Sequence, residues 1–379
     1  MTSHSRPSWR SWRSWQSWRR TFVLLLITLT PGLAFAQGRI SNAKTETRAV
    51  AQSLDREVQA VAARGAATWI GYRAPMVAGP RQMCCYDSIS SAGSCCGQCR
   101  LEGGSGVTMS HDDSRVSLEP PSEFLVLARV DGRAATQPGG VVSRIRTFTP
   151  DCDIDAAGMP LVWLNDVKPE DSVAWLSSMV NGAPETGELH ERVAKPALAA
   201  IAMHNAAAAD RALEGFVAVN RSEWLRTDTA FWLGNSRGEN GARLLARMMA
   251  QDPSDKVRDK AVFGLSVSKQ PSALKTLIDA ARDDKSTHVR GQALFWLAHK
   301  AGQQAVAAIT GAIDNDPETE VKKKAVFALS QLPKDEGVPL MIQVARTNKN
   351  PEVRKQTMFW LGQSKDARAV KFFEDILTK

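Results

Sequence analysis

The chain has 379 residues, of which 43% are hydrophobic and 23% charged, and its formal net charge is +8. Residues 1–36 hold five arginines and no acidic residue, so the rest of the chain carries a net charge of only +3. Such a small excess of positive charge gives no basic surface for nucleic acid. The sequence also resembles no nucleic-acid-binding module, so we expect no nucleic-acid partner.

Residues 1–36 have the features of a secretory signal peptide in the usual order. A basic region precedes the apolar stretch 22–29, and Ala34-Phe35-Ala36 predicts cleavage between Ala36 and Gln37. The apolar stretch is short and is followed by Pro31-Gly32, which disfavours an uncleaved membrane anchor. We therefore expect a periplasmic or secreted protein with no stable membrane insertion after cleavage.

The export route has an alternative. Arg19-Arg20-Thr21-Phe22 partly resembles a twin-arginine signal, which would mean that the protein folds before export. The apolar stretch is very hydrophobic, and ordinary signals also carry paired arginines. The ordinary route is therefore favoured, with the twin-arginine route as the alternative.

Residues 37–66 are polar and rich in alanine, which predicts a tether carrying one helix around 47–63. From residue 67 onward, runs of β-branched and aromatic residues alternate with Gly and Pro breaks, a pattern typical of strands. These runs are 68–72, 124–130, 141–148 and 160–164. We predict a small, mostly β domain over 67–167. Connecting helices follow over 168–192, one of them at 171–180.

All six cysteines lie in the predicted β domain: Cys84, Cys85, Cys95, Cys96, Cys99 and Cys152. An even number of cysteines in an exported protein favours disulfides, although the sequence does not assign their pairing. The disulfides would cross-link the Gly- and Ser-rich stretch 84–106, which has little apolar content to order it.

Two alternatives for the cysteines remain open. Cys84, Cys85, Cys96 and Cys99 could form a four-thiolate zinc site, although the second Cys-x-x-Cys pair usual for such a site is absent. Cys96-Gly97-Gln98-Cys99 could also be a redox pair, but the residues after it do not read as the helix that lowers a thiol pKa. We expect no cofactor, with zinc as the alternative.

The C-terminal half repeats every 32 residues. Val257, Val289, Val321 and Val353 are equally spaced, and Leu225 and Val193 extend the series upstream. Apolar residues at plus 4, 7 and 8 from these anchors share one helix face, and a second apolar set at plus 17, 20 and 24 predicts a second helix. Each unit is thus a helical hairpin that must stack on its neighbours. We predict about six hairpins over 193–379.

The turns between units carry an acid or amide, as in Asp252-Pro253, where the acid is expected to cap a helix that begins at the proline. The pattern Asp252…Val257-Arg258…Ala261…Leu265 resembles the HEAT-repeat family, in particular the bacterial HEAT-like repeats related to phycobilin lyases. This resemblance covers about half the chain and implies an Asp–Arg ladder between units. Its members would be Asp252, Arg258, Asp284, Arg290, Asp316, Lys322 and Arg354. The unit at Val193 departs from the pattern, and we expect the β domain to dock there.

At plus 6, five units carry phenylalanine: Phe231, Phe263, Phe295, Phe327 and Phe359. These rings either fill the space between adjacent first helices as a spine or line the concave surface as an apolar stripe. With Asp259, Lys323 and Lys355 beside them, the stripe would form a polar, mildly basic groove for a partner.

No catalytic constellation is apparent. Deoxyhypusine hydroxylases resemble such arrays but bind two irons through several His-Glu pairs, whereas this sequence has a single one, His190-Glu191. We therefore predict an α+β protein with an all-α HEAT-like solenoid behind a cysteine-containing β domain. Its function would be to bind a protein or peptide as a non-catalytic scaffold. The alternative is a metal-binding or thiol-redox module in the cysteine domain, with the solenoid recruiting clients.

Overall fold

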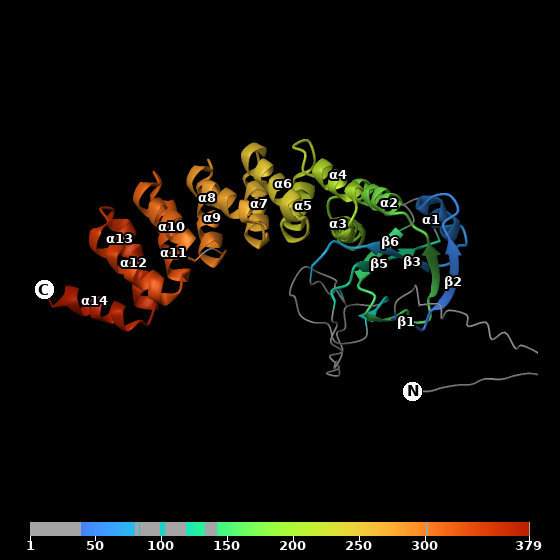
Figure 1. The fold of residues 1–379 in the computed structure, drawn as a ribbon, viewed down its shortest axis with the longest axis horizontal. Helices are drawn as coiled ribbons and strands as arrows, with labels where there is room; N and C mark the ends of the chain where they lie inside the picture. The colour runs from blue at the N-terminus through green and yellow to red at the C-terminus, as the bar shows by residue number, and fades with distance from the viewer. Residues whose placement is uncertain are drawn as a thin grey trace, which may run out of the picture. The chain divides into compact units, whose positions relative to one another are not determined.

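The computed structural model of the protein describes residues 39–79, 83, 99–102, 119–132, 142–300 and 302–378 (Figure 1). The predicted signal peptide with its cleavage site at Ala36 and Gln37 lies outside these residues, as do Cys84, Cys85, Cys95 and Cys96.

The N-terminal part is built on a five-stranded mixed sheet in the order β2-β8-β3-β5-β6. The strands are β2 (Lys44–Ala49), β3 (Thr68–Pro75), β5 (Glu123–Val130), β6 (Val142–Phe148) and β8 (Pro160–Asn165). Strands β3, β5 and β6 pair antiparallel, whereas β8 runs parallel to β2 and β3. The four strands predicted from their β-branched and aromatic runs are confirmed.

Residues 37–66 were predicted as a tether, and this prediction is wrong. Besides the expected helix, now α1 (Leu54–Ala62), they supply the edge strand β2 and the short strand β1 (Arg39–Ser41). Strand β1 lies parallel to β7 (Asp153–Asp155), which also pairs with β4 (Cys99–Arg100) in a small second sheet. Strand β2 is polar and mostly exposed because only its backbone is needed for pairing with β8.

Both faces of the large sheet are buried at its central strands β8, β3 and β5, whose side chains alternate between two cores. Trp69, Leu127 and Trp163 point to one face, where they pack with the segments around the small second sheet. Ile70 and Tyr72 point to the opposite face and belong to the core that continues into the helices. The sheet thus joins the rest of the chain through one face.

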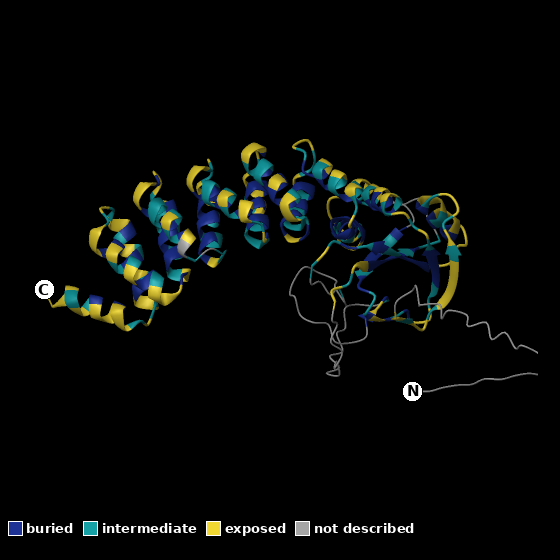
Figure 2. Cartoon of the chain, in the orientation of Figure 1, coloured by how far each residue is buried: buried dark blue, intermediate teal, exposed yellow. Residues whose placement is uncertain are grey.

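The C-terminal part is an array of helix pairs (Figure 1). The first helices of the pairs are α5 (Glu223–Ser236), α7 (Asp255–Val267), α9 (Thr287–Lys300), α11 (Thr319–Gln331) and α13 (Pro351–Gln363). The second helices are α6 (Gly238–Gln251), α8 (Pro271–Asp283), α10 (Gln303–Asn315), α12 (Lys334–Thr347) and α14 (Ala367–Leu377). In Figure 2 the buried positions face the inside of the pairs and the exposed positions lie on their outer sides and turns.

The predicted 32-residue step is confirmed by burial of the anchors, since Val257, Val289, Val321 and Val353 are all fully buried. A further pair, α3 (Lys195–Met203) and α4 (Ala207–Phe216), precedes the five regular ones and is entered through a π-helical turn, η1 (His190–Ala194). This is the irregular unit that the sequence places at Val193.

The turns differ from the prediction in one respect. Asp252 accepts a hydrogen bond from the backbone N–H of Ser254 at 2.9 Å, and α7 begins only at Asp255. Pro253 therefore lies before the helix, not in its first turn. The same holds for Pro317, since α11 begins at Thr319.

The sheet docks on the array at the irregular unit, as expected. The backbone N–H of Val77 donates to the Met203 carbonyl at 2.9 Å, and that of Asn205 donates to the Pro75 carbonyl at 2.8 Å. These bonds extend β3 onto the end of α3.

A buried polar chain fixes the same junction. It joins Tyr72 on β3, Ser172 on α2 (Pro169–Gly182) and His204 after α3, all of which are fully buried. The Tyr72 hydroxyl lies 2.8 Å from Ser172 Oγ, which lies 2.9 Å from His204 Nε2. His204 Nδ1 lies 2.7 Å from the Ala200 carbonyl oxygen, which can only accept, so Nδ1 donates this bond. Because burial keeps the imidazole neutral at pH 7, Nε2 accepts from the Ser172 hydroxyl.

Burial lowers the pKa of His204 to about 4 and raises that of the Tyr72 phenol. The unfolded chain binds a proton on this histidine near pH 6.5, whereas the folded chain does so only near pH 4. The junction should therefore lose stability as the pH falls from about 6.5 to 4, at about 1.4 kcal/mol per pH unit.

Lowering the pH from 7 to 5 reduces the unfolding free energy of the wild type through His204. We predict that in the His204→Gln variant this reduction is smaller by about 2 kcal/mol. Urea unfolding followed by tryptophan fluorescence at the two pH values measures the difference. An identical pH dependence in both proteins would contradict a neutral, buried His204.

The close approach of α5 and α7 gives a second prediction. A Cβ atom on Gly234 would overlap the carbonyl of Gly264, whereas Gly362, at the equivalent position of α13, has open space around it. We expect Gly234→Ala to lower the unfolding free energy by about 2 kcal/mol, in the range of overpacked sites. Gly362→Ala should instead raise it by up to about 1 kcal/mol, because alanine favours the helix. Equal effects in thermal unfolding would show that the two helices do not approach so closely.

Candidate functional site

The predicted ladder and groove residues lie on the first helices of the pairs or in the turns before them, in two sets. The charged ladder lies at the beginnings of these helices, and the phenylalanines lie one and a half turns further along. The ladder joins the successive units whose first helices carry the rings.

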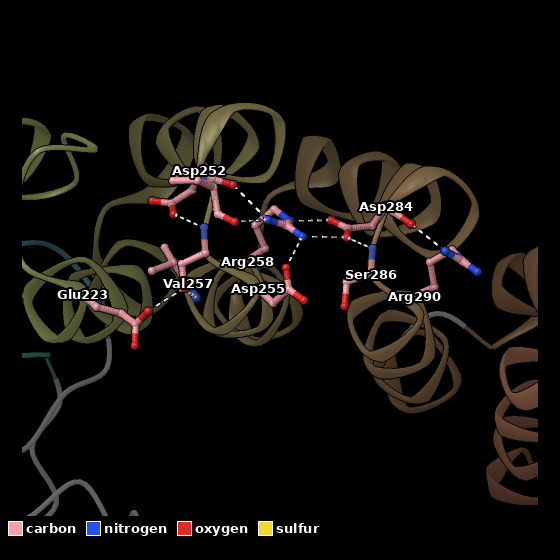
Figure 3. Close-up of polar contacts among 10 residues, drawn as sticks. Glu223, Asp252, Asp255, Val257, Arg258, Asp284, Ser286 and Arg290 are labelled. Carbon is pink, nitrogen blue, oxygen red and sulfur yellow. Dashed lines mark hydrogen bonds and ion pairs between the residues drawn. The ribbon is translucent and has the colours of Figure 1, made fainter.

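Figure 3 shows one rung of the ladder in detail. The Arg258 guanidinium donates to both carboxylate oxygens of Asp284 in the next unit, from Nε at 2.9 Å and from Nη2 at 3.2 Å. Its Nη1 donates to the Asp252 carbonyl at 2.9 Å, and Arg258 is only 1% exposed. Asp284 in turn accepts from the Ser286 backbone N–H at 2.8 Å. One arginine thus joins the turns before two successive first helices.

The next rung repeats this geometry, with Arg290 on the Asp316 carboxylate at 2.8 and 3.0 Å. A preceding rung pairs Arg226 with Asp252 at 3.0 Å. Arg226 was not among the predicted ladder members, although it follows the anchor Leu225 just as Arg258 follows Val257.

The prediction is wrong for two ladder members. Lys322 donates to the Asp314 carbonyl at 2.7 Å, and Arg354 donates to the Asn348 carbonyl at 2.8 Å. Asn348 stands where the earlier units have aspartate, and it keeps only the turn bond, from the Asn350 backbone N–H at 2.9 Å. The carboxylate is replaced by an amide at the step where the arginine is replaced by lysine, so no charge is buried there without a partner.

Arg258 and Arg354 form a matched pair for mutation. Arg258→Met leaves the buried Asp284 carboxylate without its partner, so we expect it to cost about 3 kcal/mol of unfolding free energy. Arg354→Met removes bonds to carbonyl groups alone and should cost about 1 kcal/mol. Urea unfolding measures both values, and equal losses would mean that the Arg258–Asp284 pair does not hold the units together.

The second set forms a continuous line of aromatic rings, here called the aromatic row. Its members are Phe231, Trp232, Phe263, Phe295, Trp296, Phe327, Phe359 and Trp360. Phe231 and Phe263 stack with ring centroids 5.9 Å apart, and Phe295 and Phe327 do the same. Between these pairs, Trp296 contacts Phe263 at 5.0 Å. The row therefore crosses all five regular units without a break.

The tryptophans alternate with small residues for a reason that the contacts make plain. Trp296 packs over Phe263 of the preceding unit, and Trp360 packs over Phe327 at 4.9 Å. The units that supply these covered phenylalanines have Gly264 and Ala328 where their neighbours have tryptophan, and both are buried. Trp296 and Trp360 thus each contact the phenylalanines of two units.

Both predictions for the phenylalanines hold in part. Phe231, Phe263, Phe295 and Phe327 are half-buried and touch their neighbours, as a spine would require. They also retain exposed surface, and Phe359 is 54% exposed, as a stripe would require.

Polar side chains border the aromatic row. Asp259 Oδ1 lies 3.4 Å from His288 Nε2, and Lys323 Nζ lies 3.0 Å from Glu320 Oε1. Lys355 is exposed. The stem of Lys324 crosses α9 at Gly291, where any side chain on the glycine would collide with it. This border is more cationic along α11 and α13 than along α5 and α7.

Nothing in this border indicates catalysis. Within the residues placed by the structure, no three or more His, Cys, Asp or Glu side chains are grouped so as to hold a metal ion. Burial raises the pKa of Asp228, and neighbouring Lys195 and His190 oppose that rise.

Cys99 and Cys152 are the cysteines that the structure places. Both are buried, and neither is a free thiol. The disulfide framework and the zinc alternative remain predictions, because Cys84, Cys85, Cys95 and Cys96 lie outside the described residues. None of the described helices is long and apolar enough to cross a membrane.

Comparison with known proteins supports the repeat assignment. Residues 241–329 and 306–379 match the HEAT-repeat family. Comparison with curated proteins finds no match. The C-terminal part of this chain is therefore a HEAT-repeat domain.

Among solved structures, the chain is similar to the complex of CpcE and CpcF of phycocyanin lyase from Nostoc sp. PCC7120. The identity is 23%, the match covers 41% of this chain and 99% of that one, and the TM-score is 0.31. Human deoxyhypusine hydroxylase shares 16% identity over 54% of this chain and 89% of its own, with a TM-score of 0.24. YibA of Escherichia coli shares 15% over 55% and 76%, with a TM-score of 0.34. At these values the likenesses transfer no activity.

Proposed function

We propose that the protein is an exported, non-catalytic scaffold that binds a protein or peptide along the first helices of its HEAT-repeat domain. The observation that carries this proposal is the aromatic row, which stays half-exposed across five units although its rings pack against one another. An apolar strip of this length on an outer surface is unusual for a protein without a partner, and polar residues border it as they border binding sites.

Export is the second part of the proposal. It rests on the arginines, the apolar stretch and the Ala34-Phe35-Ala36 end of residues 1–36, with cleavage before Gln37. The periplasm and the extracellular space are oxidising, so export agrees with cross-linked cysteines. We propose that disulfides hold the segment around residues 84–106.

The ladder and the aromatic row would have separate tasks in such a scaffold. The buried rungs Arg226–Asp252, Arg258–Asp284 and Arg290–Asp316 fix the spacing of the units. The rings then present a continuous surface in which stacked pairs of phenylalanines alternate with tryptophans. Because the rungs hold this surface in place, a partner can bind it without the free-energy cost of rearranging the scaffold.

The test is capture of proteins from the envelope fraction on the immobilised protein. The variant Lys323→Ala/Phe327→Ala/Lys355→Ala removes two cations and one ring from the proposed surface. The control variant, Lys275→Ala/Arg282→Ala/Leu340→Ala, removes two exposed cations and one half-buried apolar residue from second helices.

We expect the first variant to lose the captured protein while the control keeps it, with the helical circular dichroism of both unchanged. Equal capture by the two variants would place binding elsewhere on the molecule.

A further inference from the structure

We propose that two copies of the protein associate through α14, which pairs antiparallel with α14 of the second copy about a two-fold axis. This surface is separate from the aromatic row, so the inference does not rest on the proposed function. An uncovered apolar face, the place of that face in the repeat and a self-complementary pair of charges support it.

The last helix pair carries most of the exposed apolar side chains. Among the described residues, five large apolar side chains are exposed, and four of them lie on α13 and α14. They are Phe359 in the aromatic row and Val370, Ile376 and Leu377 on α14. Val370 is 54% exposed and Leu377 is 82% exposed, and both share one helix face with the half-buried Phe373. Helix α14 thus has an apolar stripe in contact with solvent.

The preceding units show what this stripe is suited to contact. Val370, Phe373 and Leu377 occupy the plus 17, 20 and 24 positions of the repeat. In the four regular units before the last, the residues at these positions are buried or half-buried, and each second helix contacts the first helix of the next unit. The stripe on α14 is therefore a helix-packing surface that no described element covers.

A glycine on α13 shows the same open face. Gly234 on α5 lies against the carbonyl of Gly264 in the next unit, where an added Cβ atom would collide. Gly362, at the equivalent position of α13, has open space around it. The uncovered surface therefore extends over both helices of the last pair and can receive further helices.

The charges of α14 select a second copy as the occupant. Arg368 and Asp375 already form ion pairs within the chain. Lys371 and Glu374 are exposed and have no ion-pair partner among the residues that the structure places. They lie three residues apart on one side of the stripe. In an antiparallel pair of α14 helices, each Lys371 lies opposite Glu374 of the other copy, whereas a parallel pair would bring like charges together.

Sedimentation velocity of the full protein at concentrations from about 1 μM to 1 mM measures this association. We expect a monomer–dimer equilibrium without larger species, because a two-fold interface closes at two copies. Val370→Ala should weaken dimerisation at least about tenfold, since apolar contact is lost from both copies. The matched control is Val219→Ala: this valine is 56% exposed but lies after α4, so its truncation should leave association unchanged.

A charge exchange tests the antiparallel pairing. Lys371→Glu and Glu374→Lys each bring like charges together across the two-fold axis, so each variant alone should dimerise at least about tenfold more weakly than the wild type. An equimolar mixture of the two variants should form a heterodimer, because every facing pair then has opposite charges. The helical circular dichroism of all variants should be unchanged, since the altered side chains are exposed.

A protein that stays monomeric over the whole concentration range would overturn the inference, as would equal association of the Val370→Ala and Val219→Ala variants. Failure of the charge variants to associate in the mixture would overturn the antiparallel arrangement. Growth beyond a dimer would overturn the two-fold axis. If the wild type is monomeric and Val370→Ala abolishes capture of an envelope protein, α14 binds a different protein and not a second copy.

Discussion

A helical hairpin of this array cannot bury its apolar face alone, so each unit depends on the next for its stability. Fully buried anchors such as Val257 and Val289 show where that burial takes place. Stacking apolar faces does not by itself fix how far one pair is turned or shifted against the next. The bidentate pairs Arg258–Asp284 and Arg290–Asp316 fix this rotation and shift, because a guanidinium and a carboxylate form two parallel hydrogen bonds in only one relative orientation.

The consequence is an unbroken aromatic surface across the five regular units. Each first helix brings one phenylalanine to the same place, and the alternation of tryptophan with Gly264 or Ala328 lets one large ring cover the phenylalanine of the unit before it. The ladder ends at Lys322 and Asn348, yet the rings continue to Phe359. The aromatic row therefore does not require a charged rung at every step.

Much of this could be predicted from the sequence, because the relevant signals are local or periodic. The four apolar strands follow from patterns within a few residues, whereas the phenylalanine series follows from the 32-residue period. Strands β1 and β2 were missed because they are short and polar, and β2 is defined by pairing with β8 more than 100 residues away. The hydrogen-bonded chain Tyr72–Ser172–His204 joins three single residues from distant segments, so no spacing in the sequence predicts it. The assignment of Lys322 to the ladder overlooked a signal that was present, since Asn348, which is 26 residues later, lacks the charge that a rung needs.

The central claim is that the first-helix face carries the binding function. Hydrogen–deuterium exchange of the protein, alone and bound to a partner captured from the envelope fraction, tests it most directly. Our account predicts that binding slows exchange in the segments of α7, α9, α11 and α13 that carry Phe263, Phe295, Phe327 and Phe359, and leaves the second helices α8, α10 and α12 unchanged. Protection confined to the second helices or to the β3–β5–β6 part of the sheet would contradict it.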